Sequence, residues 1–234
     1  MPSLDSIVID ARDPAELAGF WSVALDAPVT FQGTYGTRLS LPGQFELFLD
    51  FVPVPERLER PHRLHLDLYG GAERDAVVRE LTELGAVPVD IGQGEVPWVV
   101  LADPEDFAFC VLPGQEAGVE TGSIMAVTIE ADNKDAAYAF WRDAAGWLPG
   151  AHEYTLQHPS GTGPLLAFFD PAEPSRGKSP MHLDLRVTPE EDYDAVLRDL
   201  LARGATRAEH DWGELPWTVL IDPGGNECCL LSAD

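Results

Sequence analysis

The feature that most constrains this chain is an internal repeat. Three segments of the first half return in the second half at a nearly constant offset: GEVPWVVLADP at 94–104 returns as GELPWTVLIDP at 213–223, HLDL at 65–68 returns at 182–185, and FW at 20–21 returns at 140–141. Self-similarity in a fixed order indicates two homologous halves. We therefore predict domains at residues 1–115 and 122–234, joined by a linker at residues 116–121.

Each half repeats one order of elements. A short apolar strand is followed by a helix, further strands, a second helix and closing strands. The first helix carries a start signal, with Asp13 as N-cap, Pro14 in the first turn and Glu16 at the third position. Residues 188–191 (TPEE) predict the start of the second helix of the C-terminal half, and Gly85 and Gly204 occupy positions typical of helix ends. This order predicts an α+β fold with mostly antiparallel sheet.

The charge of the chain limits its partners. It has 40 acidic and 15 basic residues and a net charge of −25. Phosphate and anionic lipid surfaces bind clustered Lys and Arg, so we expect neither nucleic acid nor a membrane as partner. The charge favours a cationic ligand, or serves only solubility.

The cysteines and the lengths of the apolar segments predict the cellular compartment. Three cysteines do not form a disulfide framework, and we expect all of them to be small core residues. No apolar stretch approaches the roughly 18 residues of a membrane span. We therefore expect a cytoplasmic protein.

The motifs resemble the vicinal oxygen chelate (VOC) superfamily, which includes glyoxalase I, bleomycin-resistance proteins and extradiol dioxygenases. The resemblance rests on Asp13-Pro14 and the aromatic pair of the first helix, on the HLDL strands, and on the DPGGNE segment at 222–227. Within the superfamily, the sequence is most similar to bacterial glyoxalase-like domains. It implies an α+β fold of four βαβββ modules in two tandem domains, in which curled, mixed or antiparallel sheets form cups with the helices outside.

The resemblance also implies positions for metal ligands. Metal-using members take ligands from four strand positions in each two-module domain, which fall here at Ser6, Asp50, His65 and Ala108, and at Ala126, Phe168, His182 and Glu227. Each half thus keeps two ligand types, His182 with Glu227 and His65 with Asp50. Zn²⁺, Ni²⁺ or Fe²⁺ needs three or more protein ligands, so both sets are incomplete. Because Ala108 replaces the closing glutamate, we expect any metal or reactive chemistry in the C-terminal cup.

Strand alternation predicts further binding residues. It places His65 and Asp67 on one face of their strand and the leucines on the other, and it does the same for His182 and Asp184. The polar side chains of each pair either face a ligand in the cup or interact with each other within the sheet. Trp98 and Trp217 each follow Glu-X-Pro and form either the aromatic wall of a ligand pocket or strand packing.

Three functions remain open from the sequence. The first is binding or sequestration of a small molecule, cationic or aromatic, in a cup-shaped pocket. The alternative is a metal-dependent lyase, isomerase or dioxygenase acting on a small oxygenated substrate in the C-terminal cup. The third is a scaffold whose cups are filled by side chains. In each case we expect a monomer or a homodimer.

Overall fold

The chain folds into four modules of one strand, one helix and three strands. The computed structural model describes residues 1–55, 63–114, 121–171, 179–210 and 213–233. The first module comprises β1 (Ser3–Ala11), α1 (Pro14–Leu25), β2 (Val29–Gly33), β3 (Gly36–Ser40) and β4 (Phe48–Pro53). The second comprises β5 (Leu64–Tyr69), the 3₁₀ turn η1 (Gly71–Glu73), α2 (Arg74–Glu83), β6 (Val87–Pro88), β7 (Val99–Ala102) and β8 (Ala108–Leu112).

The second half repeats this order. The third module comprises β9 (Ile124–Glu130), α3 (Lys134–Ala145), β10 (Leu148–Pro149), β11 (Thr155–Gln157) and β12 (Leu165–Phe169). The fourth comprises β13 (Met181–Arg186), α4 (Tyr193–Ala202), β14 (Thr206–Arg207), β15 (Thr218–Ile221) and β16 (Glu227–Leu231). The predicted α+β fold of four βαβββ modules is confirmed. The predicted linker, apart from its last residue, lies outside the described residues.

The first helix begins where its capping signal predicts. The Asp13 carboxylate accepts hydrogen bonds from the backbone N–H groups of Ala15 and Glu16 at 3.1 and 3.0 Å. These bonds satisfy donors that a helix start leaves without partners. Gly85 and Gly204 follow the ends of α2 and α4 with φ angles of +116° and +102°, which a side chain would disfavour.

The predicted start of the last helix at residues 188–191 is wrong. This segment is a turn, in which the Glu191 carboxylate accepts a hydrogen bond from the backbone N–H of Thr188. The helix starts after Asp192, whose carboxylate accepts from the backbone N–H of Ala195 at 2.7 Å. Residues 188–191 and Asp192 both offer capping side chains, and the helix begins after Asp192 because Asp192 adjoins the apolar stripe of the helix.

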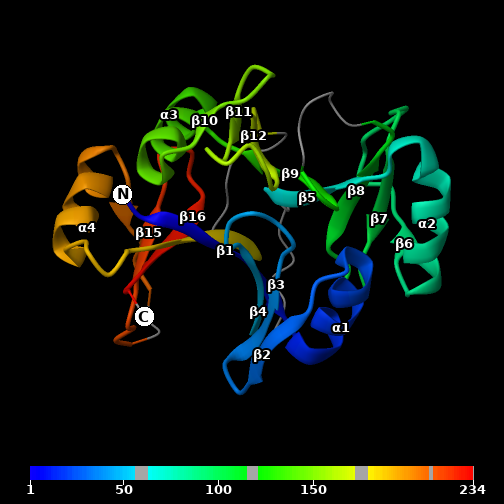
Figure 1. The fold of residues 1–234 in the computed structure, drawn as a ribbon, viewed down its shortest axis with the longest axis horizontal. Coiled ribbons are helices and arrows are strands. Elements are labelled where there is room, and N and C mark those ends of the chain that lie inside the picture. Colours follow the sequence, from blue (N-terminus) through cyan, green and yellow to red (C-terminus); the bar gives the residue numbers. More distant parts are fainter. Residues whose placement is uncertain (56–62, 115–120, 172–178, 211–212, 234) are drawn as a thin grey trace.

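The four modules form two eight-stranded sheets, and each sheet joins the two halves of the chain (Figure 1). Sheet A has the order β14-β15-β16-β13-β1-β4-β3-β2 and contains the first and last modules. Sheet B has the order β10-β11-β12-β9-β5-β8-β7-β6 and contains the two middle modules. The expectation that each half closes its own cup is therefore wrong. In both sheets the first strands of two modules pair antiparallel at the centre, β1 with β13 and β5 with β9.

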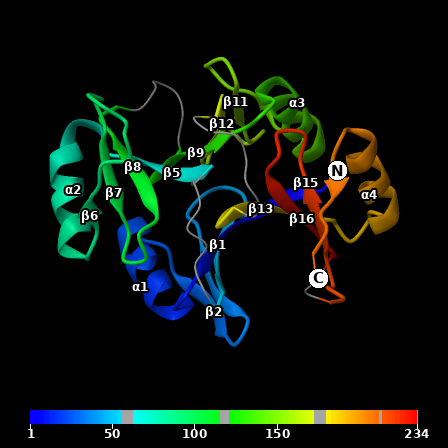
Figure 2. The same cartoon turned by 180° about the vertical axis from the view of Figure 1, so that it is seen from behind.

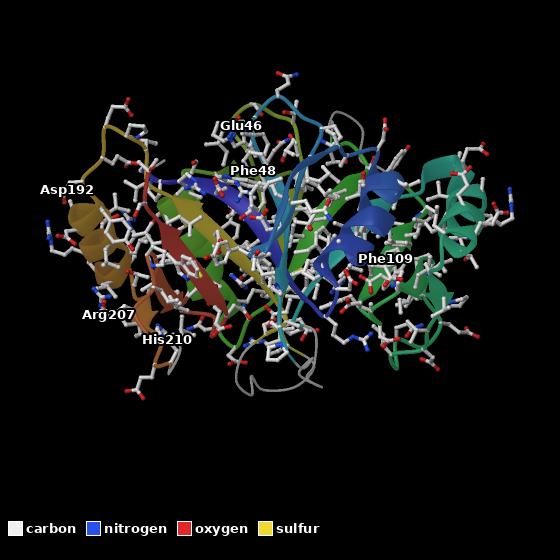
Figure 3. All side chains as sticks on the ribbon, turned by 90° about the horizontal axis from the view of Figure 1, so that it is seen from below. Glu46, Phe48, Phe109, Asp192, Arg207 and His210 are labelled. Carbon is white, nitrogen blue, oxygen red and sulfur yellow. The ribbon has the colours of Figure 1, made fainter. Side chains whose placement is uncertain are left out.

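Helices α2 and α4 lie at the two ends of the molecule, and α1 and α3 lie between the two sheets (Figures 1 and 2). One apolar core spans both sheets. Helix α1 packs on β3 and β4 of sheet A and also reaches sheet B, where Phe109 lies beside it (Figure 3). The centroids of the Trp21 and Phe109 rings are 5.0 Å apart. The indole of Trp21 donates a hydrogen bond to the buried Asp103 carboxylate at 3.0 Å. In the second half, Trp141 donates to Asp222 at 2.9 Å. The first helix of each half thus binds the two sheets together.

The HLDL strands have the predicted two faces. Leu64, Leu66 and Leu68 of β5 are buried in the core, whereas His65 and Asp67 are on the opposite face. The three cysteines are buried and free, and Cys228 lies in the core as the sequence predicts. Among the described residues, no helix has the length and apolar character needed to span a membrane.

Candidate functional site

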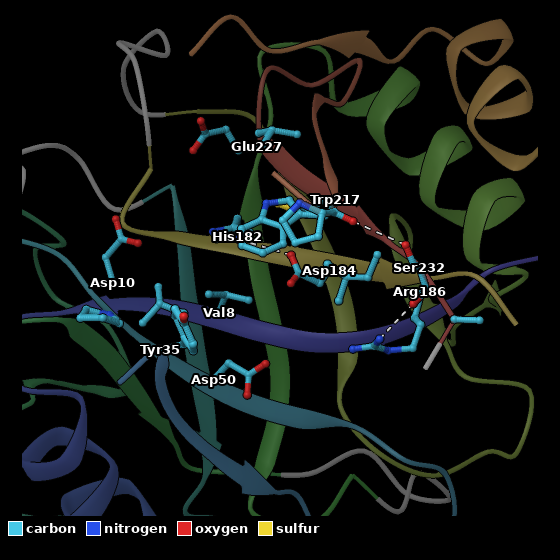
Figure 4. Close-up of a pocket in the computed structure, with 17 residues that line it drawn as sticks. Val8, Asp10, Tyr35, Asp50, His182, Asp184, Arg186, Trp217, Glu227 and Ser232 are labelled. Carbon is cyan, nitrogen blue, oxygen red and sulfur yellow. Dashed lines mark hydrogen bonds and ion pairs between the residues drawn. The ribbon is translucent and has the colours of Figure 1, made fainter. Parts of the chain in front are cut away.

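Sheet A carries a cavity of about 620 Å³ on the face opposite the core (Figure 4). Its floor and walls come from β1, β4, β13, β15 and β16, and the turn between β2 and β3 adds Tyr35. The charged and aromatic side chains that line it are Asp10, Tyr35, Asp50, His182, Asp184, Arg186, Trp217 and Glu227. The volume is in the range that holds a small-molecule ligand.

The strand register brings three of the predicted metal ligands to this cavity. Val8 of β1 pairs with His182 of β13 on one side and with Asp50 of β4 on the other. Glu227 lies at the start of the neighbouring strand β16 and lines the same cavity. Asp50 therefore lies with His182 and not with His65, because the first and last modules share a sheet.

The first-strand position of this set is occupied by Val8. The expected residue, Ser6, pairs with Asp184 two residues away along the strand and does not line the cavity. A valine side chain offers no metal ligand. The register shows this only once β1 and β13 are paired.

The equivalent positions in sheet B hold almost no ligand atoms. Asp67 pairs with Cys110 as Asp184 pairs with Cys229, so Ala108 occupies in sheet B the position of Glu227 in sheet A. His65 pairs with Thr128, which in turn pairs with Ala167, instead of the expected Ala126 and Phe168. Trp98 is at the start of β7 in this sheet and is not part of the sheet A cavity.

Asp50 is held by an arginine. Arg38 of β3 donates two hydrogen bonds to its carboxylate, at 2.7 and 2.6 Å, in a bidentate pair. The same guanidinium contacts Asp5 at 3.3 Å, and Asp5 also accepts two hydrogen bonds from Arg186. A partly buried chain of alternating charge thus runs along the cavity, to whose lining Asp50 and Arg186 contribute.

These contacts test the metal set that the VOC resemblance implies. Of the four strand positions, Val8 has no ligand atom, and Asp50 faces a guanidinium that would repel a divalent cation. Only His182 and Glu227 remain, and two ligands hold Zn²⁺, Ni²⁺ or Fe²⁺ poorly. The residues at these four positions do not fit the metal site of the superfamily.

His182 is the most buried titratable ring of the cavity. Burial disfavours the imidazolium, but the adjacent Asp184 carboxylate, with Asp10 and Glu227, outweighs it and raises the pKa of His182 above its ordinary value. Its Nε2 lies 3.3 Å from Oδ1 of Asp184. Within the described part of the chain, His182 Nδ1 has no hydrogen-bond partner.

The lining of the cavity is strongly acidic. Among the described residues, Asp10, Asp50, Asp184 and Glu227 contribute four carboxylates, of which Arg38 neutralises that of Asp50, and Arg186 contributes one guanidinium. Burial raises the pKa of Asp50 despite its contact with Arg38. Carboxylates gathered in a concave, low-dielectric site attract cations.

A comparison with protein families agrees with this architecture. The sequence model of the family described as glyoxalase-like domain matches residues 6–112 and 126–231. The chain belongs to the glyoxalase-like domain family. It is thus a member of the VOC superfamily with two tandem domains.

Solved structures show the same fold for this glyoxalase-like protein. Glyoxalase I from Zea mays has a TM-score of 0.68 at 11% identity, covering 99% of this chain and 92% of that one. A proposed dioxygenase from Bacillus subtilis subsp. subtilis str. 168 has a TM-score of 0.62 at 12% identity, covering 98% and 84%. At these identities the similarity shows the fold alone. A search of curated proteins finds no match.

Several cavity residues were not among the sequence predictions. Arg186 follows the alternation that joins His182 and Asp184 on β13, so the strand pattern contained a signal for it. Cys229 was expected to be a core residue, but it lines the cavity beside Asp184. Tyr35 and Asp10 had no distinguishing sequence pattern.

Proposed function

We propose that this glyoxalase-like protein binds a small organic cation in the sheet A cavity and sequesters it. The observation that carries the proposal is the charge of the described lining: besides Asp50, which Arg38 neutralises, the carboxylates of Asp10, Asp184 and Glu227 face one arginine in a cavity of about 620 Å³. The net charge of −25 extends this field and favours the approach of cations.

Aromatic side chains support a cation of organic character. Trp217 and Tyr35 line the cavity and are 40% and 87% exposed. An exposed indole face attracts a cation by about 0.5–2 kcal/mol, and quaternary ammonium groups suit such sites. Leu231 and Val219 add apolar surface. The predicted role of Trp217 as an aromatic wall is part of this proposal, and Trp98 has no part in it.

Calorimetric titration with matched probes tests the proposal. Benzyltrimethylammonium should bind at least tenfold more tightly than benzyl alcohol or benzoate, and added salt should weaken its binding. Equal affinity for the three probes, or no binding across a wider series of aromatic cations, would contradict it.

Two variants locate the site. Trp217→Ala should weaken binding of benzyltrimethylammonium about 3- to 30-fold, because the cation–π contact is lost. Glu227→Gln should also weaken it, because one of the four carboxylates becomes neutral. Trp98→Ala is the matched control, since Trp98 has the same motif in the other sheet, and it should leave the affinity unchanged. If Trp98→Ala had the larger effect, the site would be assigned to the wrong sheet.

The alternative function is a metal-dependent lyase, isomerase or dioxygenase acting on a small oxygenated substrate. It is favoured by the presence of His182 and Glu227 in one cavity, with the pKa of His182 raised. Val8 and the Arg38–Asp50 pair count against it. Metal-dependent turnover that Glu227→Gln abolishes would favour this alternative over sequestration.

A further inference from the structure

Two groups of histidine, aspartate and cysteine occupy equivalent places in the two sheets. In sheet A the group is His182, Asp184 and Cys229, and its potential ligand atoms all lie within 4.8 Å of one another. In sheet B it is His65, Asp67 and Cys110, within the same limit. Neither group is the set of four strand positions that the superfamily uses for metals.

Backbone pairing positions each group. The histidine and aspartate are two residues apart on one strand and therefore share a face. The cysteine is directly opposite the aspartate on a parallel neighbour, Cys229 opposite Asp184 and Cys110 opposite Asp67. Each group is thus held by two hydrogen-bonded strands, which provides a rigid support for ligands.

The contact between imidazole and carboxylate has the spacing of two metal ligands. The distance from Nε2 to Oδ1 is 3.3 Å for His182 and Asp184 and 3.4 Å for His65 and Asp67. Charge-assisted hydrogen bonds are shorter, about 2.7–2.9 Å. Metal bonds of about 2.0–2.1 Å at the tetrahedral angle separate a nitrogen and an oxygen ligand by about 3.3 Å.

A second observation concerns the Asp184 carboxylate of sheet A, whose Oδ1 has Nε2 of His182 as a neighbour at 3.3 Å. Oδ1 of Asp184 is buried and has no well-formed hydrogen bond within the described residues. A buried carboxylate oxygen in this state is costly unless a cation or donor reaches it. In sheet B, Thr128 donates a hydrogen bond to Oδ2 of Asp67 at 2.7 Å. That bond fixes the carboxylate with Oδ1 toward His65, as partners of metal-ligating carboxylates do.

We propose that each group binds one borderline transition-metal ion, of which Zn²⁺ is the type, through imidazole nitrogen, carboxylate oxygen and thiolate sulfur. Thiolate and imidazole favour Zn²⁺ over Mg²⁺ or Ca²⁺, which prefer oxygen ligands alone. On binding, the cysteine S–H bond breaks, its proton passes to the buffer, and a sulfur–metal bond forms without change of oxidation state. Three protein ligands leave one position of the ion open, which in sheet A adjoins the cavity.

The proposal does not rest on the organic cation, although the sheet A group lines the same cavity. The sheet B group lies outside the cavity, and in sheet A one carboxylate and one thiolate neutralise a divalent ion. Asp10 and Glu227, with Asp50 neutralised by Arg38, would still outnumber Arg186. Failure of metal binding would thus leave the proposed function standing, and the reverse also holds.

Titration of the full-length, chelator-treated protein with Zn²⁺ and Co²⁺ tests the proposal. Calorimetry should give two equivalents of Zn²⁺ and a heat that depends on the buffer, because protons are released. Co²⁺ should produce a thiolate-to-metal charge-transfer absorption. Mg²⁺ should give neither signal. Uptake well below one equivalent, with no charge-transfer band, would show that the contacts are ion pairs only.

Cysteine variants assign the sites. Cys229→Ser and Cys110→Ser should each remove one equivalent and about half of the Co²⁺ band, with affinity at the altered site reduced at least about 100-fold. Cys228→Ala is the matched control, because Cys228 adjoins Cys229 but is buried in the core, and it should keep both equivalents. Should a cysteine variant fail to fold, His182→Gln and His65→Gln should remove the same equivalents. If the Cys110→Ser/Cys229→Ser double variant still bound two equivalents of Zn²⁺, the proposal would be overturned. If only one of the two single variants lost an equivalent, the site in the other sheet would be overturned.

Discussion

Arg38 offers the sharpest test of how the cavity is built. Its guanidinium is 25% exposed and donates two short hydrogen bonds to Asp50, which is 14% exposed. Arg38→Met keeps much of the aliphatic stem but removes the charge, together with the guanidinium that lies over the Phe48 ring at 4.3 Å. The Asp50 carboxylate then remains next to the cavity without its counter-ion, whereas Asp5 keeps Arg186.

The expected loss of stability follows from these exposures. Removing one partner of a fully buried ion pair costs about 3–5 kcal/mol. Water in the cavity can reach this pair, so we expect Arg38→Met to lower the free energy of unfolding by about 2–3 kcal/mol at pH 7. The loss should shrink as the pH falls through the further raised pKa of Asp50, because the protonated carboxyl no longer needs a counter-ion.

Urea denaturation with a double-mutant cycle measures this effect. Arg38→Met combined with Asp50→Asn should be about 1–2 kcal/mol more stable than the sum of the single changes predicts. Arg203→Met is the matched control, because Arg203 pairs with Asp199 on the surface, and it should cost about 0.5 kcal/mol or less. A loss below about 0.5 kcal/mol for Arg38→Met, or strict additivity in the cycle, would refute the role assigned to this pair.

Two further predictions concern buried polar groups. Because the pKa of His182 is raised on folding, its stabilising contribution should be complete below the unfolded pKa of about 6.5 and lost as the pH rises through the folded pKa. In the presence of chelator, the difference in unfolding free energy between the parent and His182→Gln should therefore decrease with rising pH. A pH-independent difference would contradict this. Trp21→Phe removes the indole that donates to the buried Asp103 and should lower the free energy of unfolding, measured by chemical denaturation, by about 2–3 kcal/mol. Trp141→Phe removes the equivalent bond to Asp222, and its effect should lie within about 1 kcal/mol of that value. A larger difference would show that the two halves do not depend equally on this bond.

Much of the fold follows from local sequence pattern. The Asp13 cap, the glycines after the second helices and the two faces of the HLDL strands all depend on residues close together in the chain. Capping failed as a predictor only at residues 188–191, where two capping segments adjoin and the packing of α4 decides between them.

Less of the candidate site than of the fold could be predicted from local sequence pattern. The sequence indicated that His182, Glu227 and Asp50 have the chemistry of metal ligands, and it offered Asp184 and Trp217 as candidates for facing a ligand, with packing within the sheet as the alternative. It could not indicate that Arg38 holds Asp50, because that contact depends on the pairing of β3 with β4. Nor could it place Val8, instead of Ser6, beside His182.

By itself, the sequence determined the repeat, the four modules, the order of elements and the alternation that separates core-facing from cup-facing residues. These depend on periodicity and on capping, which act over a few residues. Only the tertiary structure decided which modules share a sheet. The four modules resemble one another, and the pairing of β1 with β13 joins residues about three quarters of the chain apart, such as Val8 and His182, so no local pattern selects it over pairing within a half. That pairing brings Asp50 into one cavity with His182 and Glu227, and sets the acidic character of the site.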